Sequence, residues 1–340
     1  MKKVIIDCRY LGMSGIGRFL EGILNNFNFN LYDVTLIGKK DKIEKYPNLK
    51  YIYDDTNPYS KTIIKWDKVK DINKCDIYFT PNFVIPYGIK IKCYAVLHDI
   101  IFLDMKDINK NFLEYKLKKV LLKRCMKKCA HVFTVSKFSQ DRISYYFKKY
   151  SNKLSYCYTG VESNFRNYNK EVSKGNYIVF VGNIKKHKGL KTLLEAMPFV
   201  NSDIKLKIIG DAKNFRNGDK DIINSIDNPN VEFTGWVSDE ELLDLVANAR
   251  YLVQPSSYEG FGLPPLEALY LGTQPIVSDI EVFKEVYSSM PVKFFKLNDS
   301  KDLANTINQN PDLISINKEE YNNKFTHKNF IKELDNLFNI

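Results

Sequence analysis

The stretch YLVQPSSYEGFGLPPLEALYLGTQP, residues 251–275, decides the fold of the second half of this chain. It begins as a short apolar run and breaks at Pro255. After a glycine turn at 260–262 it reads as a helix, with proline in the first turn and Gly272 at the end. A strand, a glycine turn and a helix in this order direct backbone N–H groups at an anion.

Two glutamates, Glu259 and Glu267, bracket this turn. One lies in the expected loop and the other inside the expected helix, so both can face a ligand seated over the helix start. Amides suit a phosphate and carboxylates suit hydroxyl groups, which predicts a nucleotide diphosphate with hydroxyl-rich groups at each end. The alternative is a buried strand-to-helix connection that carries two solvated glutamates.

The length and composition of the chain indicate two α/β domains. With 340 residues, of which 44% are hydrophobic, the chain exceeds the usual size of a single core. We expect domains over residues 1–170 and 171–320, followed by one helix over 321–340. No apolar run is as long as a membrane-spanning helix, and Asp7 interrupts the first apolar run, so we expect a cytoplasmic chain without a signal peptide.

The six cysteines form no CxxC pair, so we expect reduced, mostly structural thiols. Cys125, Cys129 and His131 lie close in sequence, but this group is not predicted to bind a metal.

Charge is distributed unequally between the two halves. Residues 1–170 carry 32 lysines and arginines against 16 aspartates and glutamates, a net charge of +16, whereas residues 171–340 carry 19 against 24, a net charge of −5. A basic half suggests a polyanion such as a nucleic acid, an anionic membrane surface or a phosphate-bearing lipid. The acidic half argues against a nucleic acid as partner of the whole protein.

Glycines near the N-terminus resemble a dinucleotide-binding turn without matching its spacing. A strand over 4–7 precedes Gly12, Gly15 and Gly17, and we expect the next helix over 18–26. The third glycine of the fingerprint would fall at Leu20, and the strand over 34–37 ends in Gly38 rather than an acidic residue. A nicotinamide domain is therefore not predicted, although a phosphate or a sugar could approach this turn.

His98 follows a strand expected over 93–97, at the sheet edge where ligands of α/β proteins gather. It could donate to a substrate oxygen or take part in an acid–base relay.

Residues 106–128 carry nine lysines and arginines against Asp107 and Glu114, with leucine and valine at helical spacing. This pattern fits an interfacial helix on an anionic membrane, and it fits equally a core-packing helix with a basic solvated face.

The second half continues the alternation of strands and helices. A strand over 177–181 leads into a loop with three lysines, and Lys188 stands directly before the next helix, where a diphosphate is often held. Further strands are expected over 204–209, 231–234, 277–279 and 292–295. Ser238 is expected to cap a helix over 239–249, as Ser136 in the first half is expected to cap a helix over 137–149.

Six segments together resemble the retaining glycosyltransferase family 4, in the right order and over nearly the whole chain. They are SGIGRF, VLHDI, HVFTVSKFSQ, VGNIKKHKGLKTLLEA, VEFTGWVSDEEL and PSSYEGFGLPPLEALYLG. The last segment contains the family's two glutamates separated by seven residues. The resemblance implies a GT-B fold, in which two Rossmann-like domains face each other across a cleft and a C-terminal helix crosses back to the first domain. It also implies metal-independent transfer of a sugar from a nucleotide diphosphate, with the donor in the second domain and the acceptor in the first.

Carried over residue by residue, the resemblance assigns Glu267 to the ribose hydroxyls and Glu259 to the hydroxyls of the transferred sugar. Lys188 would neutralise the leaving diphosphate, and His98 would lie near the transferred sugar. The remaining donor-binding residues by resemblance are Gly260, Phe261, Gly262 and Leu263 for sugar or phosphate, Trp236 and Val237 beside the base, Gly182, Lys185 and Lys186 near the diphosphate, and Gly15 and Gly17 from the first domain.

One departure from the family affects the diphosphate site. Many members have arginine after the glycine at 182, where this chain has Asn183, and His187 replaces an arginine of a related subgroup. Lys188 would then act together with Lys185 or Lys186. The letters Asp219-Lys220-Asp221 are discounted as a metal motif, because their neighbours read as a loop that enters a helix.

The sequence thus predicts a cytoplasmic glycosyltransferase, peripheral on the inner face of the membrane, that adds a hexose to a lipid-linked surface glycan such as a capsule or lipopolysaccharide. GDP-mannose is the first expected donor, and no cofactor or specific nucleic acid is expected. Two alternatives remain open: a sucrose- or trehalose-type synthase with a soluble acceptor, and a degenerate GT-B scaffold without activity.

Overall fold

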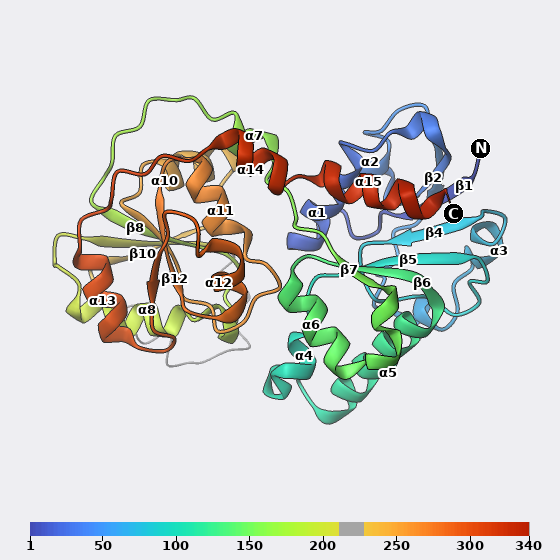
Figure 1. Cartoon of the computed structure of the whole chain (residues 1–340), viewed down its shortest axis with the longest axis horizontal. Helices are drawn as coiled ribbons and strands as arrows, with labels where there is room; N and C mark the ends of the chain where they lie inside the picture. The colour runs from blue at the N-terminus through green and yellow to red at the C-terminus, as the bar shows by residue number, and fades with distance from the viewer. Residues whose placement is uncertain (211–227, 340) are drawn as a thin grey trace. The chain divides into compact units, whose positions relative to one another are not determined.

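The chain folds into two compact α/β units in the computed structural model (Figure 1). The first unit comprises Met1–Gly160 together with Lys324–Ile340, and the second comprises Val161–Asn323. The structure describes residues 1–210 and 228–339, apart from the side chain of Ser14. The boundary expected at residue 170 falls inside the second unit, and the roles expected for the two domains remain predictions.

The first unit is built on a seven-stranded sheet in which all neighbouring strands are parallel. Its spatial order is β3-β2-β1-β4-β5-β6-β7, so the direction of winding reverses between β1 and β4. The strands are β1 (Lys3–Asp7), β2 (Asp33–Gly38), β3 (Lys50–Tyr53), β4 (Ile77–Thr80), β5 (Lys92–Leu97), β6 (Cys129–Thr134) and β7 (Leu154–Tyr156).

Helices cover this sheet, and several are a single turn long. They are α1 (Ser14–Leu24), α2 (Lys40–Ile43), α3 (Val69–Ile72), α4 (Ile101–Asp104), α5 (Phe112–Lys128), α6 (Lys137–Tyr146) and α15 (His327–Phe338), with 3₁₀ helices η1 (Phe29–Leu31), η2 (Lys61–Ile63), η3 (Lys106–Ile108) and η4 (Lys148–Lys153). Ser136 caps α6 as expected, since its side chain accepts a hydrogen bond from the amide of Ser139.

The C-terminal helix α15 packs on the first sheet, although it follows the whole second unit in sequence. Phe330 places its ring 4.7 Å from that of Phe133 and 6.2 Å from that of Phe79, measured between centroids. At the far end of α15, the Tyr94 hydroxyl donates to the carbonyl of Leu337 at 3.0 Å. The expected return of this helix to the first domain is confirmed.

The single helix expected over 321–340 is in the structure two helices, α14 (Lys318–Lys324) and α15. Thr326 separates them, because its backbone is extended and its side chain accepts a hydrogen bond from the amide of Lys328. A threonine that caps the second helix ends the first.

The second unit has a six-stranded parallel sheet in the order β10-β9-β8-β11-β12-β13, with its own reversal between β8 and β11. Its strands are β8 (Tyr177–Val181), β9 (Lys205–Ile209), β10 (Val231–Gly235), β11 (Tyr251–Gln254), β12 (Gln274–Ser278) and β13 (Lys293–Phe295). Its other described elements are α7 (Ser163–Arg166), α8 (Leu190–Ala196), α10 (Asp239–Ala247), α11 (Leu263–Tyr270), α12 (Glu281–Tyr287), α13 (Ser300–Asn308), and 3₁₀ helices η5 (Lys186–Lys188) and η6 (Met197–Phe199). Both sheets therefore have a Rossmann-like strand order, in which the first strand lies beside the fourth.

The first helix begins earlier than expected. It starts at Ser14 rather than near residue 18, so Gly15 and Gly17 lie in its first turn and not in a preceding loop. A Cβ atom on Gly17 would lie 2.6 Å from the carbonyl oxygen of Tyr10, so this glycine lets α1 approach the loop that follows β1.

The cysteines are free thiols, and the Sγ atoms of Cys125 and Cys129 lie 3.7 Å apart. His131 is bonded to Ser155 through Nε2. Within the described ranges 1–210 and 228–339, none of the helices has the length and apolar character needed to cross a bilayer.

Replacing the buried Phe330 with alanine should destabilise the first unit by about 3–5 kcal/mol, the usual cost of deleting a buried aromatic ring. The ring is 1% exposed and touches partners on β4, β6 and α1. Hydrogen exchange of the β4–β6 amides measures the loss. Phe112→Ala removes the same group from a side chain that is 65% exposed and should leave exchange nearly unchanged. Equal effects of the two substitutions would contradict the packing of α15 on this sheet.

Candidate active site

The strand order of the second sheet reverses between β8 and β11, and this is where ligands bind in open α/β sheets. The loop after β8 carries Lys188, and the loop after β11 carries Glu259. The sheet therefore brings together two predicted site residues that lie far apart in sequence.

Lys188 and Glu259 form a close ion pair. The ammonium group of Lys188 lies 2.7 Å from Oε1 and 2.9 Å from Oε2 of the carboxylate. The hydroxyl of Ser256 donates to Oε1 at 2.7 Å, and the side-chain amide of Gln254 donates to the same oxygen at 3.3 Å. A charge in a buried position needs such partners, so the site holds the carboxylate in one orientation.

Both glutamates of the opening stretch are buried. Glu259 is 8% exposed and Glu267 is 3% exposed. The alternative of two solvated glutamates is therefore wrong for this pair.

The two loops that carry the ion pair are pressed together at a glycine. Gly189, which follows Lys188, has a φ of +70°, and a Cβ atom on it would lie 1.9 Å from the carbonyl oxygen of Pro255. The amide of Ser257 donates to the carbonyl of His187 at 2.8 Å. Backbone contacts thus set the position of Lys188 relative to the β11 loop, and sequence reasoning missed Gly189.

His187 does not replace the charge of the arginine found at this place in related sequences. Burial, together with the nearby charge of Lys188, lowers the pKa of the His187 imidazole to about 4. The ring is therefore neutral near pH 7, and Lys188 supplies the positive charge here. Lys185 and Lys186 precede His187 in the same loop, and both are exposed.

The turn between the two glutamates is held by a tyrosine that the sequence did not single out. Tyr287, at the end of α12, donates through its hydroxyl to the carbonyl of Gly262. Burial, and the charges of Glu267 and Glu259, keep the pKa of this phenol well above its ordinary value, so it stays a donor. Gly262 has a φ of +82°, and a Cβ atom on it would lie 2.4 Å from the Phe283 ring.

The start of α11 offers fewer amides than the sequence suggested. Pro264 and Pro265 stand in its first turn and carry no N–H group. The amides there come from Leu263 and Leu266, and Leu266 bonds to Tyr287. Gly260 and Phe261 are buried beneath this turn, whereas Leu263 is half-buried.

A glycine with positive φ lies at the carboxyl end of each of three neighbouring strands in the second sheet. Gly182 directly follows β8, Gly210 directly follows β9, and Gly235 is the last residue of β10. A Cβ atom on Gly210 would lie 2.2 Å from the carbonyl oxygen of Gly182, so the backbones approach closely at this edge. After Gly235, Trp236 is 82% exposed and Val237 is half-buried. Trp236 therefore presents an open ring face at the carboxyl end of β10.

In the first unit, His98 follows β5 as expected and is held from two sides. Its Nε2 lies 3.1 Å from the carbonyl oxygen of Pro81, and its ring packs edge-to-face on Phe19 with a centroid distance of 4.9 Å. A carbonyl only accepts, so Nε2 carries the proton and Nδ1 is an acceptor. Burial lowers the pKa of His98 to about 4, which favours a neutral hydrogen-bonding group over an acid–base relay at neutral pH.

The two N-terminal glycines differ in their surroundings. A Cβ atom on Gly15 would have no neighbour within 4 Å, whereas Gly17 is packed against the β1–α1 loop. Gly15 therefore leaves open space beside the start of α1, and Gly17 has a structural role.

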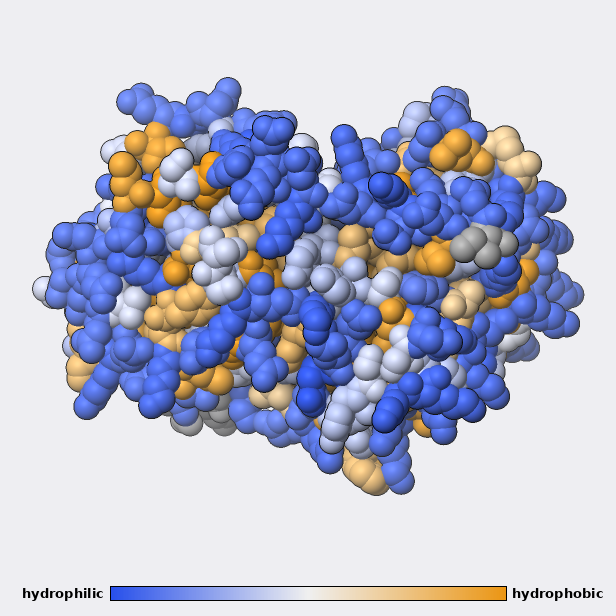
Figure 2. Space-filling model, in the orientation of Figure 1, coloured by the Kyte–Doolittle hydropathy of each residue, from blue (hydrophilic) through white to orange (hydrophobic). Residues whose placement is uncertain are grey.

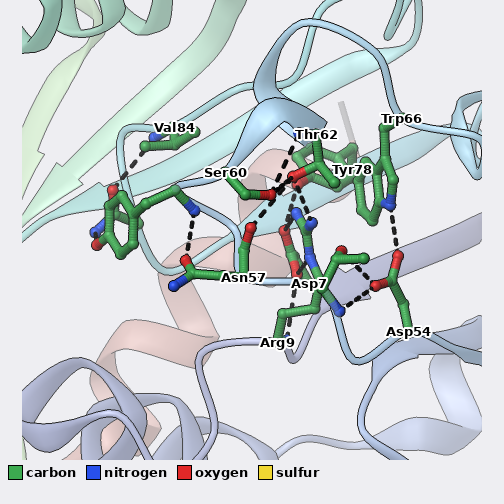
Figure 3. A network of polar contacts seen from close by, with 12 residues as sticks. Asp7, Arg9, Asp54, Asn57, Ser60, Thr62, Trp66, Tyr78 and Val84 are labelled. Atoms are coloured by element: carbon green, nitrogen blue, oxygen red, sulfur yellow. Dashed lines mark hydrogen bonds and ion pairs between the residues drawn. The ribbon is translucent and has the colours of Figure 1, made fainter.

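A buried polar network lies at the carboxyl end of β1, where the first sheet reverses (Figure 3). Asp7 accepts from Arg9 at 2.7 Å and from the hydroxyl of Tyr78 at 2.7 Å. The Arg9 guanidinium lies 3.6 Å from the Trp66 ring centroid, and the Trp66 indole donates to Asp54 at 2.5 Å. The network fixes the loop around residues 54–66 to the sheet edge. Its only sequence signal is the pair of opposite charges, two residues apart, at the end of β1.

In the part of the chain that the structure describes, no three histidine, cysteine, aspartate or glutamate side chains form a group that could hold a metal ion. Asp219, Lys220 and Asp221 lie outside the described residues.

Comparison with known proteins agrees with this fold. The family model "Glycosyl transferases group 1" matches residues 161–328. The chain is 32% identical over 209 residues to the O-antigen chain mannosyltransferase RfbU of Salmonella typhimurium, with 60% of this chain and 58% of that protein covered. It is 25% identical over 228 residues to the O-antigen chain mannosyltransferase B of Escherichia coli, covering 62% and 58%. The match thus spans less than two thirds of either relative.

Among solved structures, HepE of Anabaena in complex with UDP and glucose superposes with a TM-score of 0.76 at 14% identity, over 100% of both chains. The two Rossmann-like sheets are therefore those of a GT-B fold. Residues 161–328 of the chain, which include nearly all of the second unit, thus belong to the glycosyl transferases group 1, the retaining family 4.

His98 should titrate near pH 4, because its ring is buried and burial disfavours the imidazolium form. Its folded pKa lies below the ordinary 6.5, so its contribution to stability is present above pH 6.5 and is lost as the pH falls toward 4. Long-range ¹H–¹⁵N NMR should show a neutral ring protonated at Nε2 from pH 8 to pH values well below 6. Phe19→Ala exposes the ring and should raise this pKa. A wild-type midpoint near 6.5 would contradict the geometry.

Proposed function

We propose that the protein is a retaining glycosyltransferase that moves a hexose from a nucleotide diphosphate sugar to a growing surface glycan. The observation that carries this proposal is the Lys188–Glu259 ion pair at the switch point of the second sheet, with Glu267 buried in the helix that follows. These three groups lie at one edge of the sheet. The cation matches the phosphate of such a donor, the first carboxylate matches its sugar, and the second carboxylate matches its ribose.

Lys188 can pair with Glu259 or with the diphosphate of the donor, and we expect its partner to change during the reaction. In the free protein its ammonium group holds Glu259, while its side chain remains 21% exposed. A diphosphate at this edge would draw the ammonium group toward the phosphate oxygens and release Glu259 to accept hydrogen bonds from the sugar. As the bond between sugar and phosphate breaks, negative charge grows on the diphosphate, and a preorganised cation stabilises it.

Other residues would orient the donor. We assign Glu267 to the ribose hydroxyls and the exposed ring of Trp236, with Val237, to the base. Lys185 and Lys186 add positive charge near the diphosphate, beside the backbone of Gly182 and the turn from Gly260 to Leu263. With three lysines in one loop to balance the diphosphate, we expect transfer to persist in the presence of EDTA.

The first unit would bind the acceptor. In it, Nδ1 of His98 would accept from a hydroxyl of the transferred sugar, and the open space beside Gly15 would admit a phosphate. We place the protein in the cytoplasm, on the inner face of the membrane, with a lipid-linked glycan as acceptor.

Mannose from GDP-mannose is the donor we propose first. Support comes from the two O-antigen mannosyltransferases that the chain resembles over about 60% of its length. Because both relatives are named for O-antigen chains, they also motivate a surface glycan as acceptor.

Lys188→Met should lower the rate of transfer about 10²- to 10³-fold, the usual effect of removing one charged or polar group that stabilises the transition state. Glu259→Gln keeps the shape of the side chain, removes its charge and should also impair transfer. Single-turnover kinetics with saturating nucleotide sugar measures both. Lys191→Met is the matched control, because this lysine is exposed on α8 and lies 4.0 Å from Glu195. A wild-type rate in Lys188→Met would remove the pair from the mechanism, and melting temperatures would reveal a loss of folding.

Incubation with GDP-mannose, UDP-glucose, UDP-galactose and dTDP-rhamnose, each with a lipid extract, should yield a lipid-linked product from GDP-mannose. Mass spectrometry and NMR identify the added sugar and its α or β configuration, which reports retention. Transfer to a soluble sugar without lipid extract would favour the synthase alternative. Release of nucleotide from none of the donors would indicate a scaffold and sink the proposal.

A further inference from the structure

The first half of α5 exposes apolar side chains that are not packed in the core of the first unit. Phe112 is 65% exposed, Leu113 76%, Leu117 55% and Val120 55%. The same helix buries Leu122, Cys125 and Met126 in the core of the first unit, whereas Leu121 is buried in a smaller cluster with Ile63 and Val84. At 3.6 residues per turn, Leu113, Leu117 and Val120 fall on one outward stripe.

Two neighbouring loops extend this stripe. Arg124 of α5 donates to the carbonyls of Ile85 and Pro86, each at 3.0 Å, and its guanidinium lies 3.8 Å from the Tyr87 ring centroid. The amide of Tyr87 donates to the carbonyl of Ile63 at 2.8 Å, which places Ile64 beside it. Tyr87 is 45% exposed and Ile64 is 76% exposed.

We call this surface the basic apolar face, and its apolar residues are Ile64, Tyr87, Phe112, Leu113, Leu117 and Val120. Exposed lysines surround them, at positions 61, 65, 110, 116, 119, 123 and 127. Among acidic groups on the same elements, Glu114 pairs with Lys118 at 2.9 Å, and Asp67 pairs with Lys68 at 2.8 Å. Asp107 precedes α5. The net charge of the face is strongly positive.

The arrangement distinguishes between kinds of partner. A nucleic acid or another soluble polyanion would contact the lysines, yet it would leave the exposed leucine, isoleucine and phenylalanine in water. An anionic bilayer offers phosphates to the lysines and the boundary of the acyl chains to the apolar stripe. In Figure 2 a small hydrophobic patch lies at the end of the molecule where α4 and α5 meet in Figure 1, bordered by hydrophilic residues.

We propose that the basic apolar face docks on an anionic lipid bilayer, with α5 parallel to the surface, its lysines at the headgroups and its leucines between them. This inference rests on the proposed function, which places the protein at a membrane, and it names the surface that makes the contact. Vesicle binding is measured without a nucleotide sugar, so a failure to bind vesicles is distinguishable from a failure to transfer sugar. If the acceptor is lipid-linked, docking would place the first unit at the acceptor's membrane.

The test uses the full chain and sedimentation with vesicles of phosphatidylcholine alone or with 30% phosphatidylglycerol. Binding to the anionic vesicles and little binding to the neutral ones is expected, with affinity that falls as salt rises. Leu113→Ser combined with Leu117→Ser should weaken binding at least tenfold. Lys116→Gln with Lys119→Gln and Lys123→Gln should weaken it similarly.

Matched controls lie in the second unit. Leu313→Ser changes a fully exposed leucine, and Lys191→Gln with Lys284→Gln and Lys301→Gln removes three exposed lysines. Both controls should bind vesicles like the wild type. Circular dichroism and melting temperatures confirm that each variant is folded.

The depth to which α5 inserts into the lipid distinguishes docking on a bilayer from binding of a soluble anion. Leu117→Trp should be quenched by vesicles of brominated lipid, and an excess of soluble glycerophosphoglycerol should not displace the protein. The proposal would be overturned if the protein did not bind anionic vesicles at low salt, or if the serine variants bound them like the wild type. It would also be overturned if the protein bound a duplex RNA as tightly as it binds anionic vesicles and the serine substitutions did not change its affinity for the RNA.

Discussion

The contact between Lys188 and Glu259 is the interaction on which the site depends. A buried carboxylate is stable only with a cation or several donors beside it, and here it has Lys188, Ser256 and Gln254. Residues from two loops, separated by three strands in sequence, can meet in this way only because β8 and β11 are neighbours at the reversal of the sheet. The parallel topology thus brings together the cation and the carboxylate that we propose for a diphosphate sugar.

Close backbone approaches keep these charges in place. Gly189 admits the carbonyl of Pro255, and Gly262 takes a left-handed conformation beneath Phe283. Tyr287 then anchors the same turn through its hydroxyl. In the first unit, the network around Asp7 and Arg9 performs the same task for the loop over residues 54–66 (Figure 3). Both units therefore use buried polar or glycine contacts at the sheet edge to hold the loops that follow the strands.

Much of the fold follows from local sequence signals, and the misses have identifiable reasons. Central strands such as β8 and β11 are short apolar runs, and Ser136 and Ser238 cap the helices they precede, so these were predicted. The edge strand β3 was not predicted, because it is only four residues long and none of its residues is fully buried. The break at Thr326 was missed, because a threonine inside an amphipathic stretch can sit within a helix or cap one.

By itself, the sequence determined which residue types the site would contain. The order of strand, glycine turn and helix, and the spacing of Glu259 and Glu267, are local and can be read directly. Only the tertiary structure decided that Glu259 pairs with Lys188, that Tyr287 supports the turn and that His98 is a neutral ring. Each of these depends on burial and on neighbours distant in sequence. A pattern reports periodicity along the chain, whereas desolvation and hydrogen-bond partners are set by the fold.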